Sequence, residues 1–383
     1  MADPPDISAQ PSAPGAEHTS HAGSITAGEL ALVCSNYDIG VVESARKFKR
    51  GSGSSPKVVL KTSTGVYLLK RRAPGAGRDD PFRVALSHEI QIYLRERGFP
   101  APELIGTRRD HNSMLQTGGK TYELFRFVPG LRDDGSVEAA GEAGAALGLL
   151  HALLLEFEPA WKPPSGNYHA APAITRRLGE IPGRLGDPRL RAPVHALTVA
   201  YQEAGRQAES GVAASPTQLI HADWHPGNML FARAASGVGP ILAVVDYDSV
   251  RLGPRVLDAA SGALQFSLIR STPRAKYADS GVATNTQQSP ITLNDSRFTA
   301  FFRGYHRFAR PALAPTELTA LPWLMVEALV GEAAVAAGGS GKASGRITPG
   351  SVPTLLRFVE KKVAWMMENA SRLASMAAAS AER

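Results

Sequence analysis

The segment that decides the fold lies in the middle of the chain and reads His221-Ala222-Asp223-Trp224-His225-Pro226-Gly227-Asn228. A short apolar stretch, 229–231, follows it, and a second apolar stretch further along ends in Asp246-Tyr247-Asp248. Single Asp and Asn residues in loops usually serve turns and caps. Here Asn228 comes five residues after Asp223, and Asp246 ends a predicted strand. We therefore interpret Asp223, Asn228 and Asp246 as parts of one site.

These three side chains have the chemistry that phosphoryl transfer needs. Transfer to a hydroxyl requires a carboxylate beside the nucleophile and oxygen ligands for the metal ion that neutralises a triphosphate. The spacing from Asp223 to Asn228 is that of a kinase catalytic loop. The sequence therefore predicts magnesium-assisted transfer from ATP, with Asp223 as the catalytic residue and with Asn228 and Asp246 as metal ligands.

Two alternatives stay open. His221, Asp223 and His225 alternate, so on an extended strand they would project to one side, as the ligands of a metal-dependent hydrolase do. Pro226 and Gly227 argue against such a strand. A catalytically silent, kinase-like binding or scaffold protein is the second alternative, although the motif residues are all present.

Length and charge limit the class of protein. A chain of 383 residues exceeds the usual size of a single core, so two lobes are expected. The composition, 43% hydrophobic and 20% charged, is that of a soluble globular protein. The net charge of +7 favours anionic partners such as nucleotide phosphates. It is spread along the chain without a basic run, so we expect no nucleic-acid partner.

Cysteine usage and the N-terminus bear on the compartment. The single cysteine, Cys34, excludes an internal disulfide framework and fits a reducing cytoplasm. The first residues lack the basic flank and the apolar stretch of a secretory signal. The most apolar segment, 139–161, is interrupted by acidic residues and predicts a buried helix rather than a membrane span. We expect a cytoplasmic protein without a membrane partner; the sequence does not indicate an oligomeric state.

Periodicity divides the chain into three parts. Residues 1–24 are rich in Pro, Ala, Gly and Ser and predict a disordered tail. Residues 25–129 predict a small lobe with helices over 26–37 and 81–97 and strands at 41–42, 58–62, 66–70, 103–105 and 122–128. Residues 130–383 predict a mainly helical lobe, with helices at 136–155, 186–209, 255–270, 296–309, 315–337 and 351–377 and short strands at 218–221 and 241–245. Two weakly structured insertions, 272–292 and 338–350, are expected within it.

The motif His-x-Asp-x-x-x-x-Asn with a downstream Asp resembles the aminoglycoside phosphotransferase and choline kinase superfamily, in particular its spore-coat-kinase-like or homoserine-kinase-like branch. The segment Leu147-Gly148-Leu149-Leu150-His151 resembles a helix typical of that family. The resemblance implies an α+β, protein-kinase-like two-lobed fold, with a small antiparallel-sheet N-lobe and a mainly helical C-lobe. It also implies ATP and Mg²⁺ as cofactors and a small-molecule hydroxyl acceptor.

The same resemblance implies a nucleotide site. Lys70, at the end of a predicted strand, is similar to the phosphate-binding lysine, and Glu89 is similar to its helix partner, with Glu96 and Glu103 as nearby alternatives. The loop with Gly51 and Gly53 would let backbone amides approach the phosphates. The residues that would contact adenine are those of the hinge: Phe125, Arg126, Phe127 and Val128.

Three further residues are expected to support the site. His221 would orient the catalytic loop, Asp258 would brace it by hydrogen bonds, and Asp248 would assist the metal or the acceptor. The acceptor itself is not identified by the sequence. Segment 174–191 carries Arg176, Arg177, Arg184, Arg189 and Arg191. This positive charge favours a neutral or anionic hydroxyl compound over a polycation, and the insertion 272–292 would act as a lid.

Overall fold

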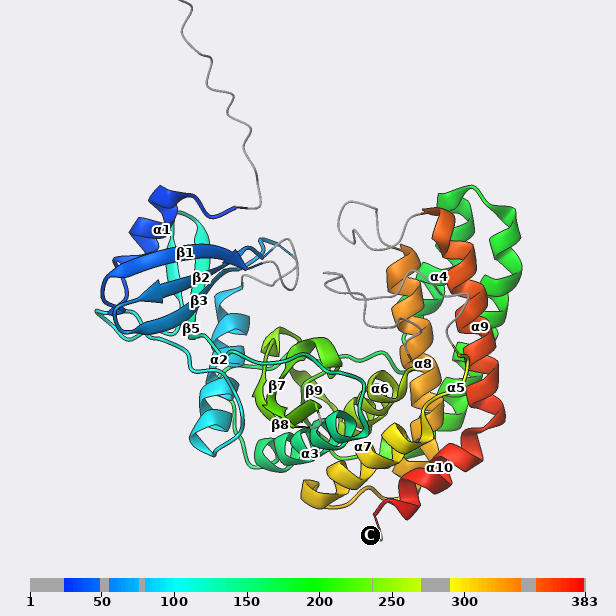
Figure 1. Ribbon diagram of the computed structural model, residues 1–383. Helices are drawn as coiled ribbons and strands as arrows, with labels where there is room; N and C mark the ends of the chain where they lie inside the picture. Colours follow the sequence, from blue (N-terminus) through cyan, green and yellow to red (C-terminus); the bar gives the residue numbers. More distant parts are fainter. Residues whose placement is uncertain are drawn as a thin grey trace, which may run out of the picture.

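The computed structural model describes residues 24–48, 55–75, 80–235, 237–269, 290–338 and 349–381. An antiparallel sheet with two helices forms one lobe, and a mainly helical body forms the other (Figure 1). Helix α2 lies between the sheet and the helical lobe (Figure 1). The predicted α+β, protein-kinase-like two-lobed fold is confirmed.

The small lobe contains a five-stranded sheet with the strand order β1-β2-β3-β5-β4. Its elements are α1 (Ala27–Cys34), β1 (Val42–Phe48), β2 (Lys57–Thr62), β3 (Gly65–Arg71), α2 (Pro81–Glu96), β4 (Leu115–Thr117) and β5 (Lys120–Arg126). One predicted strand, 103–105, is wrong: only an isolated bridge from Leu104 to Phe125 forms there. Pro102 precedes it and cannot donate to a ladder. The fifth strand is β4 instead.

The large lobe is built from helices around two small antiparallel sheets of two strands each. Its helices are α3 (Val137–Leu154), α4 (Pro172–Leu185), α5 (Arg191–Ala214), α6 (Arg255–Ser267), α7 (Asp295–Phe308), α8 (Pro315–Gly338), α9 (Val352–Glu368) and α10 (Ala370–Ala379), with 3-10 turns η1 (Pro188–Leu190), η2 (Pro226–Asn228), η3 (Tyr247–Ser249) and η4 (Pro349–Ser351). Strand β6 (Thr217–Ile220) pairs with β9 (Arg251–Pro254), and β7 (Met229–Ala234) pairs with β8 (Gly237–Val244).

Two helix predictions differ from the structure. The sequence does not predict α4, which ends at Gly186 in the left-handed conformation (φ 63°) before α5 begins. The single helix predicted over 351–377 is divided into α9 and α10 at Asn369. Most of the two insertions, 272–292 and 338–350, and residues 1–23 of the predicted tail lie outside the described residues.

Close helix packing sets the position of the catalytic segments. Helices α3 and α7 cross so closely that a Cβ atom on Gly144 would collide with the carbonyl oxygen of Phe301. By length and composition α3 and α8 could span a bilayer, but half of α3 and 78% of the most apolar window of α8 are buried within the fold. These two helices therefore serve as core helices, and strands β6 and β8 pack against α3.

Candidate active site

The predicted catalytic loop connects β6 to β7 and is closed by its own side chains. The Asn228 Nδ2 atom donates to the backbone oxygen of Asp223 at 3.0 Å and to the Asp223 Oδ2 atom at 3.0 Å. The Val245 amide donates to the backbone oxygen of Asn228 at 2.9 Å, which places Asp246 beside the loop. The structure thus brings together the three residues that the sequence predicts.

Two residues of this site have an unusual backbone. Ala222 has a φ of 60° and Asp246 a φ of 71°, in the left-handed region that residues with a Cβ rarely adopt. Each such residue costs on the order of 1–3 kcal/mol and persists only where the surroundings impose it. Each lies next to or within the predicted catalytic set, as expected where a backbone is held in a functional conformation.

Asp258 supplies part of that restraint from the first turn of α6. Its carboxylate accepts hydrogen bonds from the backbone amides of His221 (2.6 Å) and Ala222 (2.8 Å). It also accepts one from the Nε2 atom of His151 at 3.3 Å, and the Nδ1 atom of His151 accepts from the Tyr305 hydroxyl at 2.9 Å. Asp258 lies where the predicted bracing role requires it, and the resemblance alone does not reveal the link to His151.

His221 is completely buried and holds the loop by packing. Its ring lies 5.2 Å from the Trp224 ring and 5.4 Å from the Tyr247 ring, measured between centroids. Among the described residues neither ring nitrogen has a hydrogen-bond partner. Burial lowers the pKa of His221, which favours the neutral imidazole. Within the described ranges His221, Asp223 and His225 do not form a group that could hold a metal ion, as the hydrolase alternative would need.

Asp223 itself is hydrogen-bonded and ionised. Burial would raise its pKa, but the contacts with His225 and Asn228 outweigh burial and hold the pKa below the usual value. The His225 Nε2 atom lies 3.5 Å from the Asp223 Oδ1 atom, while the Nδ1 atom of His225 accepts from the Gly227 amide at 3.0 Å. The carboxylate can therefore accept a hydrogen bond from an incoming hydroxyl at neutral pH.

Lys70 lies at the lobe boundary between two carboxylates. Its Nζ atom is 3.3 Å from the Glu123 Oε2 atom and 3.2 Å from the Asp248 Oδ2 atom. Arg72 contacts the same two carboxylates, at 2.5 Å for Glu123 and 2.7 Å for Asp248. Burial would lower the pKa of Lys70, but the negative charges of Glu123 and Asp248 outweigh it and raise the pKa. Lys70 is thus a charged group that links the small lobe to the loop after Asp246.

The prediction that Glu89 is the helix partner of Lys70 is wrong. Both carboxylate oxygens of Glu89 instead accept from the Ala160 amide, at 2.9 and 3.2 Å. The α2 residue that faces the sheet is His88, whose Nε2 atom lies 2.7 Å from the Glu123 Oε1 atom. The alternative Glu103 pairs with Arg126.

Strand register explains the true partner. Lys70 on β3 stands directly opposite Glu123 on β5 and directly opposite Lys57 on β2. Directly opposed residues share one face of a sheet. Burial and the charge of Lys70 lower the pKa of Lys57. No sequence motif marks Lys57, Arg72 or Glu123 as site residues, although aligning strand 66–70 against strand 122–128 pairs Lys70 with Glu123.

The predicted hinge overlaps the end of β5 and continues past it. Phe125 is paired with β3, and the amides of Arg126 and Phe127 already donate to carbonyl groups of neighbouring segments, at 2.8 and 2.9 Å. Of the four predicted hinge residues, Val128 is the one whose amide has no hydrogen bond to another described residue. Gly51 and Gly53 lie outside the described residues.

The oxygen atoms around Asp246 fit a magnesium ion. Burial and the negative charges of Asp248 and Asp223 raise the pKa of Asp246, so a divalent cation would relieve repulsion there. The Nδ2 atom of Asn228 points to Asp223, which leaves its amide oxygen as a ligand of the kind that Mg²⁺ prefers. The predicted assistance of Asp248 is limited by its ion pairs, and these hold its pKa below the usual value against the effect of burial. Within the described ranges, no group of three or more His, Cys, Asp and Glu side chains has metal-binding geometry.

One more carboxylate lies near the catalytic loop. Glu332, on α8, accepts a hydrogen bond from the Gln265 Nε2 atom at 2.6 Å. Its side chain reaches solvent but is crowded by protein, and this burial, together with the charge of Asp223, raises its pKa to about 7. Its charge in turn acts on His225. Glu332 lies far from the motif in the sequence, so no local pattern predicts it.

A sheet lysine held beside an Asp-Asn-Asp loop in a two-lobed fold defines the class of kinase-like phosphotransferases. Residues 46–315 match the model of the phosphotransferase enzyme family, and the chain belongs to that family. No curated protein sequence matches the chain significantly.

Solved structures share the fold at low identity. An amicoumacin kinase in complex with AMP-PNP, Ca²⁺ and Ami is 12% identical, with a TM-score of 0.63 over 88% of this chain and 93% of that one. An aminoglycoside phosphotransferase from Alicyclobacillus acidocaldarius is 16% identical, with a TM-score of 0.59 over 91% and 95%. A microcompartment-associated aminopropanol kinase is 15% identical, with a TM-score of 0.59 over 90% and 98%. At these identities the likeness concerns the fold.

Proposed function

We propose that the protein transfers the γ-phosphate of magnesium-ATP to a hydroxyl group of a small molecule. One observation supports the proposal: the ion pair of Lys70 with Asp248 brings a lysine of the small lobe beside the loop that carries Asp223, Asn228 and Asp246. Membership of the phosphotransferase enzyme family supports it.

Each residue of the site has a separate role in the proposed reaction. Lys70, together with Lys57 and Arg72, would bind the phosphates, and the Val128 amide would contact the base. Asn228 and Asp246 would hold Mg²⁺, which neutralises the charge of the phosphates when it is bound. Asp223 accepts a hydrogen bond from the acceptor hydroxyl and aligns it with the γ-phosphate. Most of the catalysis would then come from positioning and from charge neutralisation.

The surroundings of Asp223 also bear on the acceptor. The expectation of a neutral or anionic acceptor depends on the arginines of 174–191, but Arg184 donates to carbonyl groups at the end of α8 and Arg189 pairs with Asp187. The charge of Glu332 acts on His225, and the charge of Asp223 acts on Glu332, so this carboxylate belongs to the surroundings of the Asp223–His225 pair. We propose a polar acceptor that presents a hydroxyl to Asp223 and a hydrogen-bond donor to Glu332.

The test is an ATP-consumption screen of the purified protein with Mg²⁺ over sugars, amino alcohols, hydroxy amino acids and aminoglycosides. We expect at least one hydroxyl compound to accelerate consumption and to appear as its phosphate ester. A rise in melting temperature with magnesium-ATP, without turnover on any compound, would favour the scaffold alternative. Stoichiometric zinc in the protein without nucleotide consumption would favour the hydrolase.

A further inference from the structure

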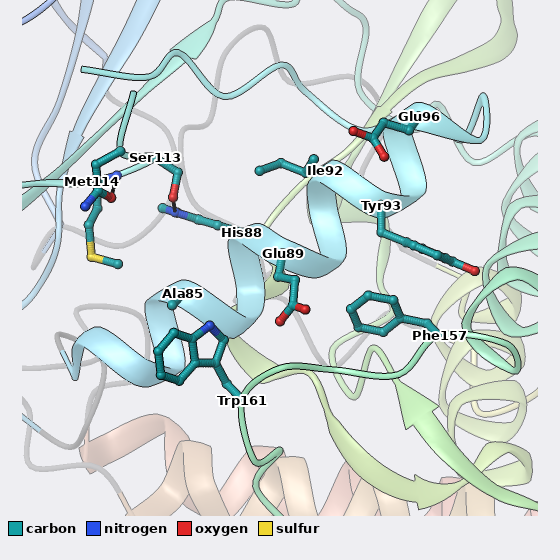
Figure 2. A pocket seen from close by; sticks show the side chains of 11 residues that line it. Ala85, His88, Glu89, Ile92, Tyr93, Glu96, Ser113, Met114, Phe157 and Trp161 are labelled. Atoms are coloured by element: carbon teal, nitrogen blue, oxygen red, sulfur yellow. Dashed lines mark hydrogen bonds between the residues drawn. The ribbon is translucent and has the colours of Figure 1, made fainter. Parts of the chain in front are cut away.

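A cavity lies on α2, and no residue of the catalytic loop lines it. Its volume is about 520 Å³, and its walls come from one face of α2, from residues 112–114 before β4 and from the segment after α3 (Figure 2). Figure 2 shows Glu89, Tyr93, Phe157 and Trp161 around the opening. The cavity therefore joins a helix of the small lobe to a segment of the large lobe.

The cavity walls combine aromatic rings with carboxylates. The rings of Tyr93 and Phe157 have centroids 4.5 Å apart, and Trp161 lies 5.2 Å from Phe82. Trp161 is 39% exposed, more than a core tryptophan would be. Glu89 and Glu96 line the same space, and none of its described lining residues is Lys or Arg, although the Arg97 guanidinium lies 3.6 Å from the ring centroid of Tyr93. Aromatic faces and carboxylates together attract a cation with an apolar body, through cation–π and ionic contacts.

A hydrogen-bonded chain connects this cavity to Lys70. The wall residue Ser113 is 2.8 Å from the Nδ1 atom of His88, and the Nε2 atom of His88 is 2.7 Å from Glu123. Glu123 is a carboxylate that holds Lys70. In the neutral imidazole, the acceptor carboxylate requires the proton on Nε2, and the Ser113 hydroxyl then donates to Nδ1. Any ligand that fixes α2 against residues 112–114 and the segment after α3 would therefore fix the carboxylate that orients Lys70.

We propose that this cavity, which we call the α2 pocket, binds a small organic cation with an aromatic or aliphatic body, and that its occupation increases the affinity for nucleotide at Lys70. The coupling to nucleotide depends on the proposed function, whereas the binding of the cation does not. Because coupling between two sites is reciprocal, nucleotide must increase the affinity for the cation by the same factor.

Binding is tested first on nucleotide-free protein, with benzyltrimethylammonium as the probe, by calorimetry and by Trp161 fluorescence referenced to Trp161→Leu. Benzyl methyl ether and benzoate serve as the neutral and anionic controls. We expect saturable binding of the cation and none of the neutral or anionic control. Glu96→Gln should weaken the binding of the cation about tenfold, because ionic attraction and cation–π contacts both contribute to it. The matched control Glu368→Gln, an exposed carboxylate on α9, should leave the affinity unchanged. The proposed binding site would be overturned if the wild type did not bind the probe at millimolar concentration. It would also be overturned if Glu96→Gln and Trp161→Leu bound the probe with the affinity of the wild type.

Coupling is tested with magnesium and AMP-PNP, with and without saturating probe. We expect nucleotide to bind about 5-fold more tightly with the probe, within the usual range of allosteric coupling. Ser113→Ala should keep probe binding and lose most of this factor. A nucleotide affinity of the wild type that does not change with the probe would overturn the coupling, while the proposal that the α2 pocket binds a cation would stand. Failure of nucleotide to bind under any condition would overturn the proposed function instead, since probe binding is measured without nucleotide.

Discussion

Replacing Glu123 by Gln separates the observed partner of Lys70 from the one that the motif suggests. Glu123 is 1% exposed and contacts Arg72, His88 and Lys70 at 2.5, 2.7 and 3.3 Å. Removing one member of a buried ion pair costs about 3–5 kcal/mol, because the other charge is left uncompensated. Asp248 still contacts both cations, so we expect the lower end of that range.

The matched substitution is Glu89→Gln. Glu89 is half-buried and, among the described residues, accepts from the Ala160 amide alone, a bond that the glutamine oxygen can keep. A hydrogen bond of this kind contributes about 1 kcal/mol. We therefore expect Glu89→Gln to change the free energy of unfolding by no more than about 1 kcal/mol.

Thermal unfolding and titration with magnesium and AMP-PNP measure both effects. Glu123→Gln should lower the melting temperature by several degrees and weaken nucleotide binding roughly tenfold or more, which corresponds to at least about 1.4 kcal/mol of binding energy. Glu89→Gln should match the wild type in nucleotide affinity. The reasoning is refuted if Glu89→Gln weakens nucleotide binding as much as Glu123→Gln does.

Three further substitutions test other parts of the structure. Asp258→Asn presents an NH₂ group to an amide that needs an acceptor, at a cost of about 1–3 kcal/mol, so turnover should fall strongly while nucleotide affinity stays within about threefold; unchanged turnover would argue against the bracing role. Burial lowers the pKa of Lys362 to about 8. A lysine whose pKa is lower in the folded state destabilises the fold when charged, so wild-type stability should rise between about pH 8 and 10, by at most roughly 3 kcal/mol, and Lys362→Met should lose this slope in denaturation measured against pH. Glu332→Gln should raise the KM of the acceptor several-fold with the KM of ATP unchanged, and the reverse pattern would place Glu332 on the nucleotide side.

The catalytic loop was predictable because its determinants are local. The spacing of Asp223, Asn228 and Asp246 is readable along the chain, and the loop that carries them is closed by bonds within this segment. Asp258 came from the family resemblance, and the structure shows the amides to which it bonds. Lys70 was also assigned from the family resemblance, and it lies at the end of its predicted strand.

The remaining site residues depend on register and helix phase, which local patterns do not define. His88 and Glu89 are neighbours, and a rotation of α2 by one residue decides which of them faces Glu123. Glu123 meets Lys70 only after β5 has paired with β3. Helix α4 was missed because Pro182 and two glycines lower its helix propensity, yet it forms because Leu178 and Ile181 are buried.

Phosphoryl transfer by the wild type and by Asp223→Asn tests the central claim most directly. Both proteins are incubated with Mg²⁺, γ-labelled ATP and the acceptor found in the screen, and the labelled phosphate ester is quantified. The account predicts ester formation by the wild type and a fall on the order of 10²–10⁴-fold in Asp223→Asn, with nucleotide affinity nearly unchanged. Transfer at the wild-type rate by Asp223→Asn would contradict it.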